Sequence, residues 1–240
     1  MKISIIIPAN NEEKNIRKCL ESIKNANVPQ HIDIEIIVVL NRCTDMTEKI
    51  AKEYGAITIL DESRCLSKIR NHGVKYSTGE ILVTIDADSW MTDNMLRNII
   101  NLLAQKKYIG GGVKVYPERY SLGIKLTWFL LDLSMLITGL SGGLYWCYKN
   151  DFDAIGGFDE ELSFGEDLDF AKRLRKYGKT KGLKYKTITD SFIITSCRKF
   201  DFFGDWFIFK LMFFNQIDII KGLKKKNNKF ADKYFYDFNR

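Results

Sequence analysis

The chain has 240 residues, of which 45% are hydrophobic, 28% are charged and three are proline. This length and balance exclude a disordered chain, a collagen-like repeat and a small disulfide scaffold, and leave one large domain or two small ones. The net charge is +7, but seven basic and two acidic side chains in residues 221–240 contribute +5 of it, so the nearly neutral body argues against a nucleic-acid-binding surface.

The first half of the chain alternates two sequence periods. Apolar runs at residues 3–7, 34–40, 56–60 and 81–85 predict buried strands. The residues at helical spacing between and after them are Ile16, Cys19, Leu20 and Ile23, then Thr47, Ile50, Ala51 and Tyr54 before Gly55, then residues 67–76, then Leu96, Ile99, Ile100 and Leu103. Apolar strands alternating with amphipathic helices predict right-handed βαβ units, and therefore an α/β fold with a parallel sheet covered on both faces.

Polar residues follow each of these strands. They are Asn10 to Glu12, residues 41–45, Asp61, and Asp86 with Asp88. Ligands of open α/β sheets bind outside the carboxyl ends of the strands, so this edge is the predicted site. The turn after the first strand has no glycine, and no Gly-Lys-Ser/Thr sequence occurs. A G-x-G-x-x-G dinucleotide site and a P-loop are therefore excluded.

Asp86 and Asp88 directly follow the strand at residues 81–85. Residues i and i+2 of an extended chain point the same way, so both carboxylates leave the strand end together. Two hard oxygen ligands suit Mg²⁺ or Mn²⁺. The same spacing occurs at residues 151–153 and 167–169, but only the first pair follows a buried strand. We interpret it as a metal and diphosphate site; a solvated loop with capping aspartates is the alternative.

The second half contains two glycine-bearing loops, each followed by a helix. Gly142 and Gly143 precede a short helix predicted at residues 149–155. Glu166 and Asp167 lie in the first turn of a helix that is predicted to end at Gly178. The helix macrodipole favours ionised carboxylates there, so both residues can be explained as capping. A carboxylate held ionised can also accept a proton from an attacking hydroxyl, and both interpretations stay open at this point.

Five cysteines form no Cys-x-x-Cys pair. Their odd number and spacing argue against a disulfide framework or a zinc site, so we expect a reducing, cytoplasmic compartment. The chain enters a strand pattern directly after Met1, so we expect no signal peptide. Residues 122–140 and 202–220 are apolar but contain internal charges, which makes them poor membrane-spanning helices. Either segment could instead lie on a membrane surface.

Seven segments have the order and spacing found in family-2 glycosyltransferases. They are residues 8–13, 41–47, 70–73, 79–80, 86–88, 156–160 and 165–167. The chain resembles this family over about residues 2–200. The resemblance implies a GT-A fold, which has a Rossmann-like, mainly parallel sheet flanked by helices on both faces. It also implies transfer of a sugar from a nucleotide-diphospho-sugar with inversion at the anomeric carbon.

The resemblance also implies a division of the chain and of its site residues. Residues 1–199 would form the transferase domain, with a nucleotide-sugar-binding half at about 1–115 and an acceptor half at 116–199. The nucleotide-sugar site would contain Pro8, Ala9, Asn10, Glu12, Asn41, Asp45, Arg70 and Asp86. Asp86 and Asp88 would bind Mg²⁺ or Mn²⁺, which neutralises charge on the leaving diphosphate. Asp167 would be the catalytic base, with Glu166 beside it.

Several positions depart from the family pattern. Asn10 stands where the family often has Tyr, and Leu40 with Asn41 replaces a common acidic pair. No histidine follows Asp167; Arg198 lies in that region and could hold diphosphate oxygens in a bidentate fork, or be an ordinary surface arginine. The Gln-x-x-Arg-Trp sequence of processive synthases does not occur, so one sugar per event is expected.

The predicted tail at residues 200–240 is aromatic and basic. It would either pack across the domain or form a homodimer contact, or dock the protein at an anionic membrane such as the inner face of the plasma membrane. The acceptor, whether a glycan, a lipid-linked molecule or a small molecule, is not identified. Two other functions are alternatives. A nucleotidyltransferase would need a Gly-rich N-terminal loop with Arg, which does not occur here. The other alternative is a non-catalytic binding or scaffold protein on an inactive transferase fold.

Overall fold

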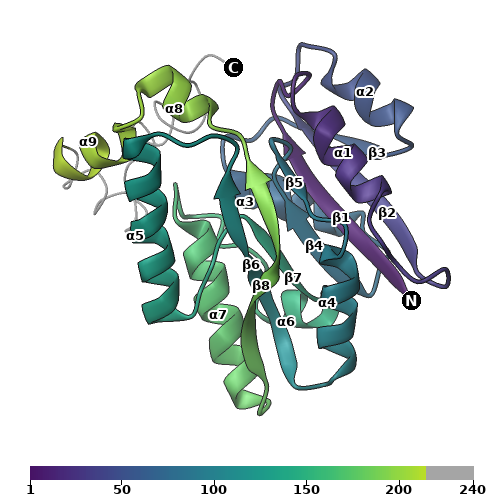
Figure 1. Cartoon of the computed structure of the whole chain (residues 1–240). Helices are drawn as coiled ribbons and strands as arrows, with labels where there is room; N and C mark the ends of the chain where they lie inside the picture. The colour runs from purple at the N-terminus through teal and green to yellow at the C-terminus, as the bar shows by residue number, and fades with distance from the viewer. Residues whose placement is uncertain (215–240) are drawn as a thin grey trace.

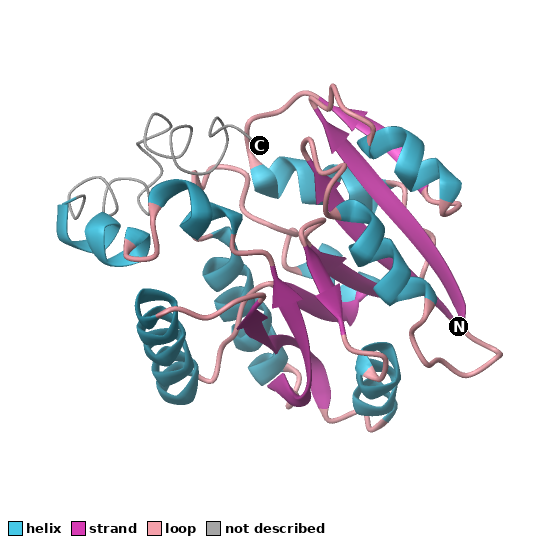
Figure 2. Cartoon of the chain, turned by 45° about the horizontal axis from the view of Figure 1, so that its top comes forward, coloured by secondary structure: helices cyan, strands magenta, loops and turns pink. Residues whose placement is uncertain are grey.

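A computed structural model describes residues 1–214 of the chain (Figure 1). Within that range the strands form one eight-stranded sheet in the order β3-β2-β1-β4-β7-β6-β8-β5. Helices cover both faces of this sheet, as expected for the α/β class (Figure 2). The lysine-rich segment after residue 220, on which part of the tail prediction rests, lies outside the described residues.

The first four long strands are the predicted ones. They are β1 (Lys2–Ala9), β2 (Asp33–Asn41), β3 (Ile57–Asp61) and β4 (Ile81–Ile85). All pair in parallel, with β1 between β2 and β4. Their carboxyl ends therefore meet at one edge of the sheet, and this confirms the predicted arrangement of the first half.

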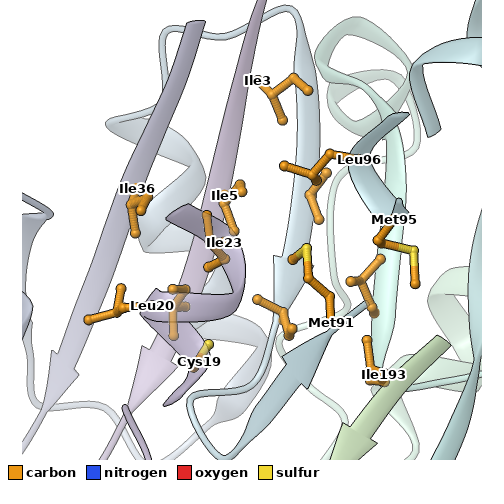
Figure 3. Packing of buried hydrophobic residues seen from close by; sticks show 14 of the residues in the cluster. Ile3, Ile5, Cys19, Leu20, Ile23, Ile36, Met91, Met95, Leu96 and Ile193 are labelled. Atoms are coloured by element: carbon orange, nitrogen blue, oxygen red, sulfur yellow. The ribbon is translucent and has the colours of Figure 1, made fainter. Parts of the chain in front are cut away.

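Alternation along β1 distributes its side chains between two hydrophobic layers. Ile3, Ile5 and Ile7 pack in one layer with helices α1 (Ile16–Lys24), α2 (Thr47–Glu53) and α4 (Met95–Ala104). Figure 3 shows Ile5, Leu20, Ile23, Met91 and Leu96 within this layer. Ile6 packs in the other layer, with α3 (Leu66–Lys75), α6 (Lys149–Ala154) and α7 (Glu166–Thr180). All four isoleucines of β1 are fully buried, which places this strand at the centre of the core.

The strands after β4 make the sheet mixed. They are β5 (Ser89–Met91), β6 (Tyr108–Pro117), β7 (Leu144–Tyr148) and β8 (Lys184–Thr195). β7 is antiparallel to β4 and β6, and β5 is antiparallel to β8, whereas β6 and β8 are parallel. The sheet is therefore parallel in its first four strands and mixed beyond them.

Helix α7 runs two residues past Gly178, the predicted end. A Cβ at Gly178 would lie 2.7 Å from Ile109 Cγ2, so this glycine serves close packing of α7 on β6 and does not terminate the helix.

The remaining helices lie together at one side of the molecule (Figure 1). They are α5 (Leu122–Thr138), α8 (Arg198–Phe203) and α9 (Phe207–Phe214). Phe200 of α8 is buried against Ile124 of α5, so the first part of the predicted tail packs on the body. None of the helices within residues 1–214 combines the length and the apolar character needed to cross a bilayer.

Candidate active site

A pocket lies at the carboxyl ends of β1, β2 and β4, and we call it the strand-end pocket. The predicted residues that line it are Pro8, Ala9, Asn10, Glu12, Asn41, Asp86, Asp88 and Arg198. It also contains Arg42, Leu66, Ile69, Ala87 and Lys199, which the sequence did not single out. Arg42 and Lys199 adjoin predicted residues, whereas nothing in the sequence marks Leu66 or Ile69. Asp45, Arg70, Glu166 and Asp167 do not line this pocket.

Two predicted residues brace the loops around the pocket. Asn41 is buried, and its Nδ2 donates to the carbonyl oxygens of Asp61 at 2.9 Å and Ser63 at 2.7 Å. The Asp45 carboxylate accepts hydrogen bonds from the backbone N–H groups of Glu13 at 3.0 Å and Thr47 at 2.9 Å. These contacts tie the end of β2 to the end of β3, and the loop after β1 to the start of α2.

Arg198 bridges two carboxylates across the pocket. Its Nη1 is 2.7 Å from Glu12 Oε2, and its Nη2 is 3.0 Å from Asp88 Oδ2. Burial raises the pKa of Glu12, and the hydrogen bond from Arg198 opposes this effect. The pocket encloses about 120 Å³, less than the ~300–1,000 Å³ of ordinary ligand pockets. A larger ligand therefore requires the surrounding side chains to move.

Arg70 on α3 joins the end of β4 to the start of α7. Its side chain is 2% exposed, and its Nη1 is 2.7 Å from Asp167 Oδ1 and 3.3 Å from Glu166 Oε1. Its Nη2 is 2.8 Å from Asp86 Oδ1. Burial lowers the pKa of Arg70, but the three carboxylates outweigh this and raise it. One buried cation thus holds three acids from two distant parts of the chain.

The neighbouring residues of the Arg-Asn-His-Gly segment each fix a different part of the structure. Asn71 exchanges two hydrogen bonds with the backbone of Phe158, both at 2.9 Å, and so fixes the loop before α7. His72 Nδ1 is 2.8 Å from Asp61 Oδ2 at the end of β3. A Cβ at Gly73 would lie 2.6 Å from Ile6 Cγ2, so this glycine lets α3 pack closely on the sheet. The segment 70–73 therefore links the end of β3 and the loop before α7 to helix α3.

Glu166 and Asp167 occupy the first turn of α7, as predicted. Burial, followed by the charge of Asp167, raises the pKa of Glu166 to about 7. Burial also raises the pKa of Asp167, against the lowering effect of Arg70. The backbone N–H of Gly143 donates to the Asp167 carboxylate, which places the Gly142–Gly143 loop beside it. Asp167 is 32% exposed, so it can still meet a ligand.

In each of the other two Asp-x-Asp pairs, one aspartate forms an ion pair outside the strand-end pocket. Asp169 forms an ion pair with Arg173, with 2.6 Å between Oδ2 and Nε, and Asp151 forms one with Lys181 at 2.7 Å. Residues 86–88 thus provide the Asp-x-Asp pair at the strand-end pocket. No group of three or more His, Cys, Asp or Glu side chains that could hold a metal occurs among the described residues. Asp86 and Asp88 are therefore the candidate carboxylate ligands for a metal in this pocket.

Residues 4–159 match the family model described as Glycosyl transferase family 2. The chain is 28% identical over 192 residues to glycosyltransferase AglE of Haloferax volcanii, a match that covers 73% of this chain and 62% of AglE. It is 27% identical to a dolichyl N-acetyl-alpha-D-glucosaminyl phosphate 3-beta-D-2,3-diacetamido-2,3-dideoxy-beta-D-glucuronosyltransferase of Methanococcus voltae, covering 81% of this chain and 66% of that enzyme. The chain thus spans about two thirds of the length of these relatives.

Two solved structures share the fold. S. aureus TarS in complex with UDP-GlcNAc superimposes with a TM-score of 0.66 at 19% identity, covering 98% of this chain and 70% of that one. The mannosyltransferase PcManGT of Pyrobaculum calidifontis, in complex with GDP-Man and Mn²⁺, gives 0.62 at 20% identity, covering 80% and 56%. The family match covers more than half of the chain, and the sheet has the order and helical layers described above. This chain therefore belongs to glycosyl transferase family 2 and has a GT-A fold.

Proposed function

We propose that the protein transfers one sugar, with inversion, from a nucleotide-diphospho-sugar to an acceptor hydroxyl. The observation that carries the proposal is the contact of Asp86 and Asp167 with the same buried guanidinium, that of Arg70. This contact brings the proposed base next to an acid that lines the strand-end pocket. The nucleotide sugars bound to TarS and PcManGT support the class of donor. They differ in nucleobase and sugar, so both are left open for this chain.

The strand-end pocket is the proposed donor site. Pro8, Ala9 and Asn10 would contact the nucleoside, and Asp86 with Asp88 would hold Mg²⁺ or Mn²⁺. Two carboxylates fit these ions, which are commonly bound by one or two carboxylates together with substrate phosphates and water. The bound metal would supply neutralisation of charge on the diphosphate.

Arg198 and Arg70 receive different roles in the proposal. Arg198 bridges Glu12 and Asp88 at the pocket, and we propose that its guanidinium turns to the donor diphosphate when the donor binds. The family resemblance implies a position for Arg70 in the nucleotide-sugar site, near the nucleobase or the diphosphate. Its Nη atoms contact three carboxylates instead, so we propose that it positions Asp86 and Asp167 without touching the donor.

Asp167 is the proposed catalytic base. A base is most effective when its pKa approaches the working pH, and burial raises the pKa of Asp167 toward that range. Accepting the proton of the acceptor hydroxyl would allow a single in-line displacement, which inverts the anomeric carbon. Glu166, with a pKa of about 7, would be partly protonated at neutral pH and so limits the negative charge around Asp167.

We further propose peripheral contact with a membrane on its cytoplasmic side. Helix α5 exposes Phe129, Leu136 and Ile137, and α8 exposes Phe202. Apolar side chains of this size on one side of a surface helix suit the interface of a bilayer. The basic residues after residue 220 would add attraction to anionic lipids. A homodimer formed through the same side is the alternative.

The proposed function is tested by binding and turnover with a panel of UDP-, GDP- and TDP-sugars, with and without Mn²⁺. A donor that fits should raise the melting temperature by mass action, and more so with Mn²⁺. The same donor should be consumed by the wild type. Binding without turnover over a broad set of acceptors would favour the scaffold alternative, and no binding to any donor would contradict both.

A further inference from the structure

Another hollow, which we call the α5 hollow, shares Asp86 with the strand-end pocket. It encloses about 410 Å³ between α5, β6, β8 and the Gly142–Gly143 loop. Its apolar wall includes Val113, Val115, Trp128, Leu131, Met135 and Ile193. Asp167 lies in this hollow and not in the strand-end pocket, and Asp86 is the residue that lines both. The two spaces therefore meet at Asp86, whose carboxylate shares the guanidinium of Arg70 with Asp167.

This arrangement assigns the α5 hollow to the acceptor, because the proposed base opens into it. The composition of its wall then restricts the acceptor. Among the described residues that line it there is no Lys, Arg, His, Asn or Gln; its polar lining residues are Asp86, Ser89, Asp132, Ser134, Ser141, Tyr145, Asp167 and Thr195. A phosphate beside Asp86 and Asp167 would meet two carboxylates, and the guanidinium of Arg70 next to them is buried and already paired with both. A hydroxyl-rich glycan could bond to the polar lining residues, but each of its hydroxyls left unpaired against the apolar wall would cost about 1–3 kcal/mol.

The rim of the hollow is apolar as well. Leu131 lines the hollow and is also 56% exposed, so apolar surface continues from the interior to the rim. Leu136 and Ile137 are exposed as well, but they lie about 140° and 120° around the helix from Leu131 and so belong to the outer side of α5. A hydrocarbon chain can therefore reach from the interior of the hollow to its rim while it stays in contact with apolar side chains.

We propose that the acceptor is a neutral amphiphile, with its hydroxyl-bearing head at Asp167 and its hydrocarbon portion in the α5 hollow. This inference rests on the proposed function, since it takes Asp167 as the base. It goes further in naming the acceptor class, which the sequence left open among glycans, lipid-linked molecules and small molecules.

Two probes with the same head separate the hydrocarbon contribution from that of the sugar. They are methyl β-D-glucoside and octyl β-D-glucoside, the latter kept below its micelle concentration, with binding to the full chain measured by calorimetry and saturation-transfer NMR. The octyl probe should bind at least tenfold more tightly than the methyl probe. Equal binding of the two would overturn the proposal.

Matched double variants on α5 locate the bound chain. Leu131→Asn with Met135→Gln changes the wall of the hollow, whereas Leu136→Asn with Ile137→Gln makes the same kind of change on the outer side. The first pair should weaken octyl binding at least tenfold and the second less than twofold. Equal loss in both pairs, or loss in the second alone, would assign the binding to a membrane-facing surface and overturn the proposal.

Donor binding is measured on the same preparations by thermal shift with Mn²⁺. Because neither pair lies at the strand-end pocket, both variants should keep the wild-type donor response, which also shows that they are folded. If the first pair alone loses the donor response, its fold is disturbed, and the test is repeated with the single variant Leu131→Asn. The side chain of Leu131 is more than half exposed, so this substitution should leave the fold intact. Absence of a donor response in the wild type contradicts the proposed function, whereas a normal donor response with octyl binding unchanged in the first pair contradicts the acceptor inference alone.

Discussion

The Arg70→Met substitution removes a buried cation that contacts three carboxylates. Methionine has a similar length and keeps much of the packing on α3, but it leaves Asp86, Glu166 and Asp167 without a positive partner. Removing one partner of a buried ion pair costs about 3–5 kcal/mol. Domains of this size have a total stability of about 5–15 kcal/mol, so the loss should be large and measurable by urea unfolding followed by circular dichroism.

The loss should also depend on pH in a defined direction. Glu166, with a pKa of about 7, and Asp167 bind protons more tightly in the folded state than in the unfolded chain. Folding is then favoured as pH falls from about 7 toward the unfolded values near 4, and without Arg70 this dependence should become steeper. The difference in stability between wild type and Arg70→Met should therefore be smaller at pH 5 than at pH 8.

Arg17→Met is the matched control, because Arg17 pairs with Glu53 on the surface and is 50% exposed. Its effect on stability should be much smaller than that of Arg70→Met at either pH, because exposed ion pairs contribute little. Arg70→Lys, which keeps the charge but not the fork, should fall between the two. A loss below about 1 kcal/mol for Arg70→Met, or an equal loss at pH 5 and pH 8, would refute the view that Arg70 balances these acids.

Three further outcomes are expected. Asp88→Ala should abolish the Mn²⁺ dependence of donor binding in calorimetry while the melting temperature of the free protein changes little; unchanged Mn²⁺ dependence would remove Asp88 from the metal site. Asp167→Asn should lower turnover about 10²–10⁴-fold with donor affinity retained, and Glu166→Gln should cost less; the opposite order in steady-state assays would move the base to Glu166. Deleting residues 215–240 should reduce salt-sensitive sedimentation with anionic liposomes, and equal sedimentation of the shortened chain would rule out an electrostatic membrane role for that segment.

The first half of the fold could be read from the sequence because its apolar periods are long and uninterrupted. Strand β6 could not, since it contains Gly110, Gly111 and Gly112, and glycine is a poor strand former. The structure gives a reason for all three, since a Cβ at any of them would clash with a neighbouring residue; at Gly111 it would meet the carbonyl oxygen of Lys186 on the adjacent strand. The close approach of β6 and β8 is a tertiary property that no local pattern carries.

The candidate site shows the same division. The acids at the strand ends were predictable because each lies directly after a strong strand pattern. Their partners were not, since Arg70 is 97 residues from Asp167 and Arg198 is 186 residues from Glu12. The sequence spacing of Asn41 and Asp45 likewise did not show that their side chains hold neighbouring loops by hydrogen bonds to the backbone.

The segment that carries Asp88 depends on a strand made much later in the chain. The carbonyl of Asp88 accepts a hydrogen bond from the backbone N–H of Ser196 at 3.0 Å, and β5, which begins at the next residue, pairs with the end of β8. Closing a loop of about a hundred residues is entropically costly and slow compared with forming the local βαβ units. On the ribosome, β1 to β4 can assemble while β8 is still being synthesised. The proposed metal ligand therefore reaches its final position only after residues 193–196 have emerged.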